Sequence, residues 1–376
     1  MKKILFYTDT PQIGGAELQM FLLAKFLNKE RFQPTLVCSN FPQLDRWCEK
    51  FKKEEIPVIR LNVKHKHDPR HYTQLKKIIK NQGIDLLHAH VWNPASCRYG
   101  FLAANSTKTP IIITEHDPFP LPYLKNIFKK SALKKTKKII TVSHNNQKIL
   151  QHLYPEFNSK ISVISNGIDI NWWQSQSLRF TDEDKKTIKE ELFWAKADTF
   201  IITTVAELHE RKGINYLIEA IPAIAAQYPN IKLVITGDGP EREKLEKLRK
   251  KLKLEKHITF LGKQKEIPKI LRSSDLFVLP SLREAFGLVN AEAMISKLAI
   301  VATRVGGIPE IISDGETGIL VERENPLALS KAIVKLIEAP EKRKKMAESG
   351  YQRVLAQFNA EKMAELYENE YLKILP

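Results

Sequence analysis

Residues 276–292 read LFVLPSLREAFGLVNAE and carry the signals of a strand, a loop and a helix in that order. The apolar run 276–279 stops at a proline and predicts a buried parallel strand. A Phe-Gly pair then interrupts the regular secondary structure, and residues 288–294 predict a helix. A strand that leads through a short loop into a helix is the repeating unit of an α/β sheet, so this segment indicates the fold class.

Two carboxylates frame this loop. Glu284 falls at the carboxyl end of the strand, where open α/β sheets bind their ligands, and Glu292 lies just over a turn into the helix. Free N–H groups of the helix start would face an anion between them. A sugar nucleotide needs this layout, with one carboxylate for sugar hydroxyls, one for ribose hydroxyls and amides for phosphate. Glutamates at such a spacing also occur by chance on charged surface helices, so the spacing alone leaves both interpretations open.

Strands and helices alternate in the same way over the rest of the chain. This alternation predicts two Rossmann-like domains in tandem, each with a doubly wound, mostly parallel sheet. The expected elements of the first domain are strands at 3–7, 35–38, 58–61, 86–90, 111–115, 139–142 and 161–164, and helices at 16–27, 44–53 and 72–80. Those of the second are strands at 200–205, 232–236, 258–260, 276–279, 299–302 and 318–321, and helices at 213–227, 240–252, 266–272, 288–296 and 326–338. Ligands are expected in a cleft between the carboxyl edges of the two sheets.

The turn signal at residues 166–169, Asn-Gly-Ile-Asp, marks the expected hinge between the domains. The boundaries are therefore expected at 1–167 for the first domain and 168–359 for the second. The tail 360–376 reads as a helix, and its Tyr367, Tyr371 and Ile374 are expected to pack it back against the first domain.

Composition and length exclude several classes of protein. The chain has 376 residues, of which 43% are hydrophobic and 27% charged, and no apolar run approaches the length of about 20 residues that spans a bilayer. The apolar stretch near the N-terminus is too short for a signal peptide. Three cysteines without CxxC spacing predict free thiols in a reducing cytoplasm. His65, His67 and His71 are expected to be solvated in a charged loop, and no cluster has metal-ligand spacing.

The net charge of +17 lies mainly in the first half of the chain. Residues 1–170 hold 27 Lys/Arg against 13 Asp/Glu, and residues 171–376 hold 33 against 30. The basic residues are most concentrated in residues 121–138. The apolar positions 124, 127, 128 and 132 of this segment share one helical face, and lysines follow them in the sequence. This pattern is typical of an interfacial helix on an anionic membrane, and an ordinary surface helix with solvated lysines is the alternative. No nucleic-acid signature accompanies the charge, so nucleic acid is not expected as a partner.

Glycine-rich turns follow several of the expected strands. They occur at 14–17, 237–240 and 306–310, and Lys212 precedes Gly213 at another helix start. Glycines let backbone approach a ligand, and helix starts favour anions. Each turn alone is weak evidence, and a solvated basic loop is the ordinary interpretation of Lys212, but their convergence on one edge indicates a phosphorylated ligand. His116 follows the strand 111–115 at the corresponding edge.

Together these residues resemble the retaining glycosyltransferases of family 4, which have the GT-B fold. The resemblance covers nearly the whole chain, and its most specific part is the two-glutamate motif with the glycine-rich segment after it. The matching segments are Gly14-Gly15-Ala16-Glu17, Ser165-Asn166-Gly167-Ile168-Asp169, Lys212-Gly213, Gly237-Asp238-Gly239-Pro240, Arg283-Glu284-Ala285-Phe286-Gly287-Leu288 through Glu292, and Gly306-Gly307-Ile308-Pro309-Glu310.

The resemblance implies roles for individual residues. Glu284 would contact hydroxyls of the donor hexose, Glu292 would bind the ribose, and Lys212 would neutralise the diphosphate leaving group. His116 would sit beside the transferred sugar, and Gly15 near the donor phosphate and the acceptor. The expected catalytic residues are thus Lys212, Glu284 and His116, and the expected donor-binding residues are Gly15, Arg211, Gly239, Ala285, Phe286, Gly287, Leu288, Val289 and Glu292.

One position departs from the family pattern. The family commonly places an Arg five residues before the Lys, and Glu207 stands there in this chain. A carboxylate cannot neutralise a diphosphate, so either Arg211 supplies the second cation or Lys212 suffices with helix amides.

The resemblance implies a metal-independent enzyme without a cofactor, which moves a hexose from a nucleoside diphosphate sugar to an acceptor hydroxyl with retention. The expected acceptor is a glycan or a lipid-linked molecule of the cell envelope, and the expected location is cytoplasmic, peripheral at the inner face of the membrane. Three alternatives stay open: a non-catalytic transferase-like binding subunit of an envelope-synthesis complex, a sugar-nucleotide epimerase, and a phosphorylase. A fourth and less favoured one, nucleic-acid binding by the basic first half, predicts a strongly salt-dependent affinity for DNA or RNA. An epimerase usually lacks the glutamate pair, and a glycogen-type phosphorylase needs pyridoxal phosphate and a far longer chain.

Overall fold

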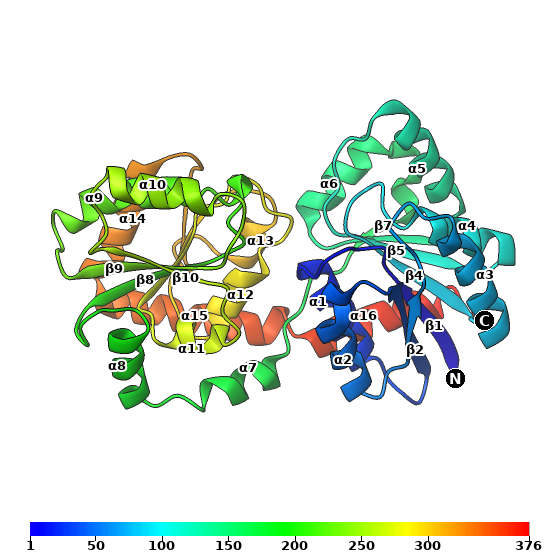
Figure 1. Ribbon diagram of the computed structural model, residues 1–376, viewed down its shortest axis with the longest axis horizontal. Helices are drawn as coiled ribbons and strands as arrows, with labels where there is room; N and C mark the ends of the chain where they lie inside the picture. The colour runs from blue at the N-terminus through cyan, green and yellow to red at the C-terminus, as the bar shows by residue number, and fades with distance from the viewer. Residues whose placement is uncertain (376) are drawn as a thin grey trace. The chain divides into compact units, whose positions relative to one another are not determined.

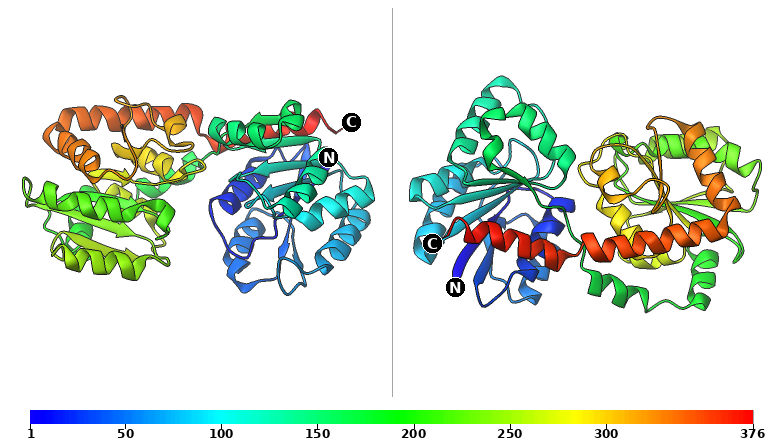
Figure 2. Two further views of the ribbon diagram at one scale, coloured as in Figure 1. Left: turned by 90° about the horizontal axis from the view of Figure 1, so that it is seen from above. Right: turned by 180° about the vertical axis from the view of Figure 1, so that it is seen from behind.

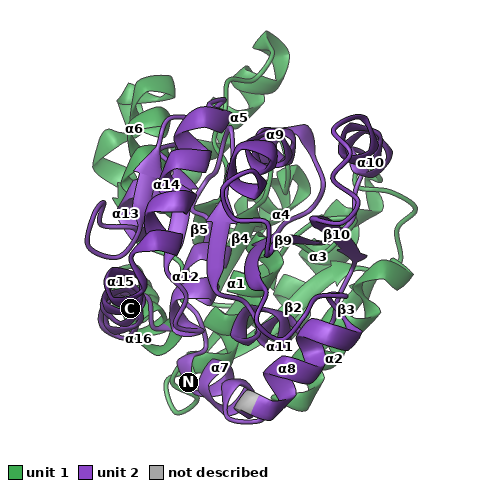
Figure 3. Cartoon of the chain, turned by 90° about the vertical axis from the view of Figure 1, so that its left-hand side faces the viewer, with its two compact units in different colours: residues 1–167, 360–376 green, residues 168–359 purple. Residues whose placement is uncertain are grey.

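A computed structural model describes residues 1–375, with the backbone alone at residue 182. The chain divides into two compact units, which we call unit 1 and unit 2 (Figure 3). Unit 1 consists of Met1–Gly167 together with Ala360–Pro376, and unit 2 of Ile168–Asn359. Each unit is built around one parallel sheet with its own hydrophobic core.

The sheet of unit 1 has seven parallel strands in the order β3-β2-β1-β4-β5-β6-β7 (Figure 1). The strands are β1 (Lys2–Tyr7), β2 (Phe32–Ser39), β3 (Val58–Leu61), β4 (Leu86–Val91), β5 (Ile111–Glu115), β6 (Lys138–Thr141) and β7 (Ile161–Val163). The chain runs outward from β1 to β3 and then returns to place β4 against the other side of β1. The direction of winding therefore reverses between β1 and β4, and such a reversal opens a crevice at the carboxyl ends of the two strands.

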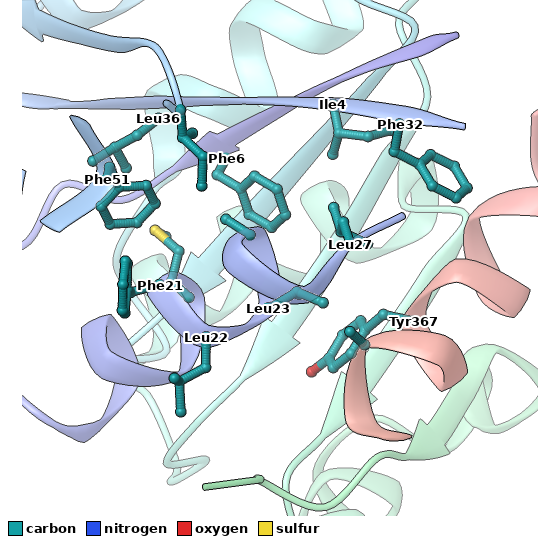
Figure 4. Close-up of a cluster of buried hydrophobic side chains, with 14 of the residues drawn as sticks. Ile4, Phe6, Phe21, Leu22, Leu23, Leu27, Phe32, Leu36, Phe51 and Tyr367 are labelled. Carbon is teal, nitrogen blue, oxygen red and sulfur yellow. The ribbon is translucent and has the colours of Figure 1, made fainter. Parts of the chain in front are cut away.

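Helices cover the sheet of unit 1, and the last of them comes from the C-terminal end of the chain. They are α1 (Gly15–Phe26), α2 (Asp45–Lys53), α3 (Arg70–Gln82), α4 (Arg98–Thr107), α5 (Tyr123–Lys135), α6 (His144–Leu153) and α16 (Ala360–Leu372), with short 3-10 turns η1 (Pro42–Leu44) and η2 (Pro155–Lys160). Figure 4 shows part of the core, where Phe6 of β1 lies among Leu23 of α1, Leu27 directly after α1, and Tyr367 of α16. These apolar side chains leave water together, and this burial is the main force that stabilises the unit.

α16 is joined to the sheet by buried hydrogen bonds. The Tyr371 hydroxyl lies 2.7 Å from Nδ1 of His88 in β4, and the Tyr367 hydroxyl lies 3.0 Å from Oγ1 of Thr114 in β5. The Tyr371 ring also packs edge-on against Phe32. Figure 2 shows α16, in red, beside the strands of unit 1. The C-terminal segment is thus part of the core of unit 1.

The sheet of unit 2 has six parallel strands in the order β10-β9-β8-β11-β12-β13. They are β8 (Phe200–Val205), β9 (Ile231–Thr236), β10 (Ile258–Gly262), β11 (Leu276–Leu279), β12 (Ile300–Thr303) and β13 (Ile319–Val321). The helices are α7 (Ile170–Ser177), α8 (Asp182–Glu191), α9 (Ile214–Ala225), α10 (Arg242–Lys251), α11 (Ile267–Arg272), α12 (Leu288–Ile295), α13 (Ile308–Ile311), α14 (Pro326–Glu338) and α15 (Pro340–Gln357), with the 3-10 turn η3 (Glu210–Lys212). Here the winding reverses between β8 and β11.

The expected α/β class with two Rossmann-like sheets is confirmed, and the predicted strands overlap β1 to β13. α15 was not anticipated, because its sequence is mostly polar and its buried positions Met346, Ala347, Gly350 and Val354 form only a narrow apolar stripe. Gly350 lets α15 approach Met294 of α12 closely. None of the helices formed by the described residues is long and apolar enough to cross a membrane.

Candidate functional site

The predicted loop residues of unit 2 lie where its winding reverses. The loops after β8 and β11 leave neighbouring strands at their carboxyl ends, and the loop after β12 leaves the next strand along. Parallel strands place their carboxyl ends on one edge, so Lys212 and Glu284, which are 72 residues apart in sequence, come together.

Glu284 and Lys212 form the central ion pair of this edge. Lys212 Nζ donates to Glu284 Oε2 at 2.5 Å, and Arg211 Nη1 lies 4.0 Å from Glu284 Oε1. Ser281 Oγ donates to the same Oε2 atom at 3.3 Å. About a tenth of each side chain of the ion pair is exposed, so both charges are reachable from solvent but held in one geometry.

Backbone contacts between the three loops hold Glu284 in place. Leu282 N–H donates to the Arg211 carbonyl at 2.8 Å, and Gly307 N–H donates to the Glu284 carbonyl at 3.2 Å. Gly306 has a φ of +55°, and a Cβ atom there would lie 1.7 Å from the Glu284 carbonyl oxygen. Only glycine fits this close approach, which explains the glycine at position 306.

The α12 start lies directly beyond Glu284. Gly287, with a φ of +92°, caps the helix, and Leu288 and Val289 form its first turn, where N–H groups have no partner within a helix. Phe286 is buried edge-on against Phe358, so its side chain belongs to the core. Ala285 lies between Phe286 and Glu284 in the same loop. The local structure therefore offers backbone groups and a helix N-terminus toward an anion.

Glu292, further along α12, has a carboxylate that makes no hydrogen bond to the described part of the chain. Burial raises its pKa from 4.5 to about 7. A part-buried carboxyl group without an internal partner is suited to accept hydrogen bonds from a ligand.

The remaining predicted residues of unit 2 lie on adjoining turns. Gly239 packs against the backbone of Leu208, and its N–H donates to Asp238 Oδ1 at 2.8 Å. Glu207, which stands at the position of the family's arginine, is exposed on the loop after β8. Arg211 is therefore the second cation beside Glu284.

Unit 1 places Gly15 and His116 at the carboxyl edge of its own sheet. Gly15 is exposed at the start of α1, where Gly14 N–H donates to Glu17 Oε2 at 2.9 Å. His116 follows β5 and is buried, with its Nε2 atom 3.1 Å from Nδ1 of His90. Desolvation lowers the pKa of His116 from 6.5 to about 3, so its imidazole is neutral at ordinary pH.

The structure corrects two expectations and adds residues that sequence reasoning missed. His71 is buried rather than solvated, with its Nδ1 atom 3.1 Å from the Tyr7 hydroxyl. Ala132 faces the core, so it does not belong to the exposed face of α5. Ser281 and His90 contact predicted site residues, but no local signal marked them, since both lie in ordinary strand-and-loop patterns.

Within residues 1–375, no group of three or more His, Cys, Asp or Glu side chains is arranged to hold a metal ion. The three cysteines are free and buried. The edge of unit 2 carries the cationic side chains of Lys212 and Arg211 and the N-terminus of α12.

Comparison with known proteins gives matches over both units. The sequence model described as "Glycosyltransferase Family 4" matches residues 13–172, and the one described as "Glycosyl transferases group 1" matches residues 184–353. An uncharacterised glycosyltransferase of Methanocaldococcus jannaschii is 32% identical over 93% of this chain and 92% of its own. The N-acetyl-alpha-D-glucosaminyl L-malate synthase of Bacillus anthracis is 28% identical over 100% of this chain and 98% of its own. The crystal structure of Anabaena HepE in complex with UDP-glucose is similar in fold, with a TM-score of 0.85, 22% identity and full coverage of both chains.

Proposed function

The chain belongs to the group 1 and family 4 glycosyltransferases, and on this basis we propose that it transfers a hexose from a nucleoside diphosphate sugar to an acceptor hydroxyl with retention of configuration. Unit 2 would bind the donor and unit 1 the acceptor. The HepE structure with UDP-glucose supports a uridine sugar as the first donor to test.

The ion pair between Lys212 and Glu284, followed by the partnerless Glu292, is the observation that carries this proposal. In the reaction the bond from the sugar's anomeric carbon to the diphosphate breaks while a bond to the acceptor oxygen forms on the same face. The acceptor proton passes to the departing phosphate oxygen. Negative charge develops on the diphosphate, where Lys212, Arg211 and the α12 amides would stabilise it in place of a metal ion. Glu284 would accept hydrogen bonds from sugar hydroxyls, and Glu292 from the ribose.

We predict that Lys212→Ala loses about a hundredfold or more of kcat while the fold stays intact, because a cation that meets developing charge contributes most in the transition state. Release of nucleoside diphosphate from a panel of uridine, guanosine and adenosine diphosphate sugars would measure the rate. Lys263→Ala, at an exposed position of the same unit, is the matched control.

Near-normal turnover of Lys212→Ala would contradict the role of this residue. Tight donor binding by the wild-type chain, without slow donor hydrolysis or transfer to any acceptor, would instead favour the non-catalytic binding subunit, an alternative that Glu207 keeps open.

We further propose that the acceptor is lipid-linked and that α5 rests on an anionic membrane at the cytoplasmic face. Tyr123, Leu124, Ile127 and Phe128 are exposed by 79%, 79%, 51% and 38%, whereas Lys129 turns inward to a buried ion pair with Glu115. An outer face of large apolar side chains with flanking lysines is the pattern of an interfacial helix.

We predict that Leu124→Ser with Ile127→Ser weakens binding to vesicles of equal parts phosphatidylglycerol and phosphatidylcholine severalfold, because these side chains would lose their burial among lipid. Vesicle sedimentation measures the effect. Leu178→Ser with Leu327→Ser removes two comparably exposed leucines from unit 2 and should leave binding unchanged. Equal binding by both double variants would contradict the membrane role of α5.

A further inference from the structure

A cavity of about 490 Å³ lies at the point of unit 1 where the winding of the sheet reverses. Asp9, which follows β1, and Trp92, which follows β4, line it from the two strands on either side of the reversal. α4 and α5 form the outer wall. Doubly wound sheets bind ligands at this place, and none of the residues predicted for donor binding lines this cavity.

Three cations surround the cavity without ion-pair partners. Lys66, Arg98 and Lys125 all line it, and none forms a salt bridge with a carboxylate of the described residues. Burial lowers the pKa of the neighbouring His67, and the positive charges of Arg98, Lys66, His65 and Lys125 each lower it further. These three cations outnumber Asp9, the one carboxylate among the lining residues, and such an excess of positive charge favours an anionic ligand.

Internal contacts orient two of these cations. Lys66 Nζ lies 5.2 Å from the centre of the Trp92 ring, and the Arg98 guanidinium lies 4.7 Å from the centre of the Tyr99 ring. The Arg98 Nε atom is buried and has no hydrogen-bond partner in the described chain. A buried donor without a partner is costly, so a ligand acceptor would stabilise it.

Asp9 is the acidic residue of the cavity lining, and its charge offsets that of Lys66 in part. Asp9 accepts hydrogen bonds from Trp92 Nε1 at 3.1 Å and from Cys97 N–H at 2.8 Å. Burial raises the pKa of Asp9, whereas these two hydrogen bonds and the charge of Lys66 lower it. Asp9 therefore serves to fix the wall of the cavity.

The other side of the cavity is apolar and continues beyond it. Phe101, Leu102, Leu124 and Phe128 form this side, and Leu102, Leu124 and Phe128 are exposed by 42%, 79% and 38%. A second cavity of about 240 Å³ shares Phe101, Leu102 and Phe128 with the first. A ligand with an anionic head and an apolar chain would match both halves of this surface.

We propose that this cavity binds the phosphate or diphosphate of a lipid-linked acceptor through Lys66, Arg98 and Lys125, with the first carbons of the lipid chain along Phe101, Leu102 and Phe128. The inference rests on the proposed transfer to a lipid-linked acceptor, because it places the phosphate group of that acceptor. It goes beyond that function in assigning a site that lies apart from the donor residues of unit 2.

Geranyl diphosphate, a soluble lipid diphosphate, is the probe that tests the site. Calorimetric titration of the full chain should show binding that weakens at least tenfold in the triple variant Lys66→Gln, Arg98→Gln, Lys125→Gln. The control Lys53→Gln, Lys80→Gln, Lys148→Gln makes the same change of net charge at exposed positions of unit 1 and should bind as the wild type does. Phe128→Ser should weaken binding of geranyl diphosphate but not of inorganic diphosphate.

Two further measurements separate this site from the donor site. Lys212→Ala should bind geranyl diphosphate normally, and the triple variant should bind the donor sugar nucleotide normally, so failure of one site does not imply failure of the other. Equal binding of geranyl diphosphate by the triple variant and the wild type would overturn the proposal. Inorganic diphosphate binding as tightly as geranyl diphosphate would also overturn it, because the site would then recognise free phosphate.

Discussion

Glu292 combines a raised pKa with a free carboxylate, and its position in α12 gives this combination a consequence for pH dependence. Its pKa of about 7 means that the group is protonated below that pH and ionised above it. An ionised carboxylate accepts hydrogen bonds from both ribose hydroxyls, whereas a protonated one gives up part of this capacity.

We therefore predict that the KM for the donor rises as the pH falls below about 7, by up to about tenfold per pH unit if ionisation is required. Steady-state kinetics from about pH 8 to about pH 6 measure this dependence. Glu292→Gln should have a higher KM that no longer varies over the same range. A wild-type KM that stays constant with pH would contradict the role of Glu292 as an ionised acceptor.

Lys212 and Arg211 differ from Glu207 in their surroundings. Both cations approach Glu284, at 2.5 Å and 4.0 Å, whereas Glu207 is exposed to solvent. Water screens the charge of an exposed carboxylate strongly, so Glu207 would oppose the proposed diphosphate less than its charge alone suggests.

The turn between β12 and α13 is an element whose shape, and not its side chains, supports the site. Gly306 lies against the Glu284 carbonyl, and the next residue donates a hydrogen bond to the same oxygen. A change of this turn should therefore move Glu284 without removing any functional side chain.

We predict that Gly306→Ala raises the donor KM at least tenfold, because its Cβ must displace the Glu284 backbone. Gly315→Ala is the matched control: Gly315 also has a positive φ, of +81°, but no atom lies within 4 Å of its Cβ position. Both variants bear a backbone strain of about 1–2 kcal/mol, so equal kinetic effects would show that strain and not crowding is responsible. Circular dichroism would verify that both fold.

At the scale of the whole molecule, α16 makes the two ends of the chain depend on each other. Tyr371 and Tyr367 bond to His88 and Thr114 of the central strands, although more than 250 residues separate each pair in sequence. Burial lowers the pKa of His88 to about 3, so its ring stays neutral and keeps the hydrogen bond to Tyr371 at ordinary pH.

We predict that Tyr371→Phe destabilises the docking of α16 by about 1–2 kcal/mol, because His88 Nδ1 is left buried without its partner. Hydrogen exchange of the α16 amides should then speed up about 5- to 30-fold. Tyr123→Phe removes a hydroxyl from a side chain that is 79% exposed and should leave the exchange unchanged. Unaltered protection of α16 in Tyr371→Phe would show that apolar packing alone holds the helix.

Features that depend on neighbours along the chain were predictable from the sequence. Strand and helix periodicity, the glycine turns and the motif around residues 284–292 depend on local backbone preferences, and the fold class and the family followed from them. Features that depend on strand order were not predictable, because order decides which distant residues meet. The contacts of Lys212 with Glu284 and of His90 with His116, and the gathering of Lys66, Arg98 and Lys125 around one cavity, exist only because parallel strands bring their loops to a common edge where the winding reverses. The glutamates and lysines were visible in the sequence, but their partners were decided by tertiary structure.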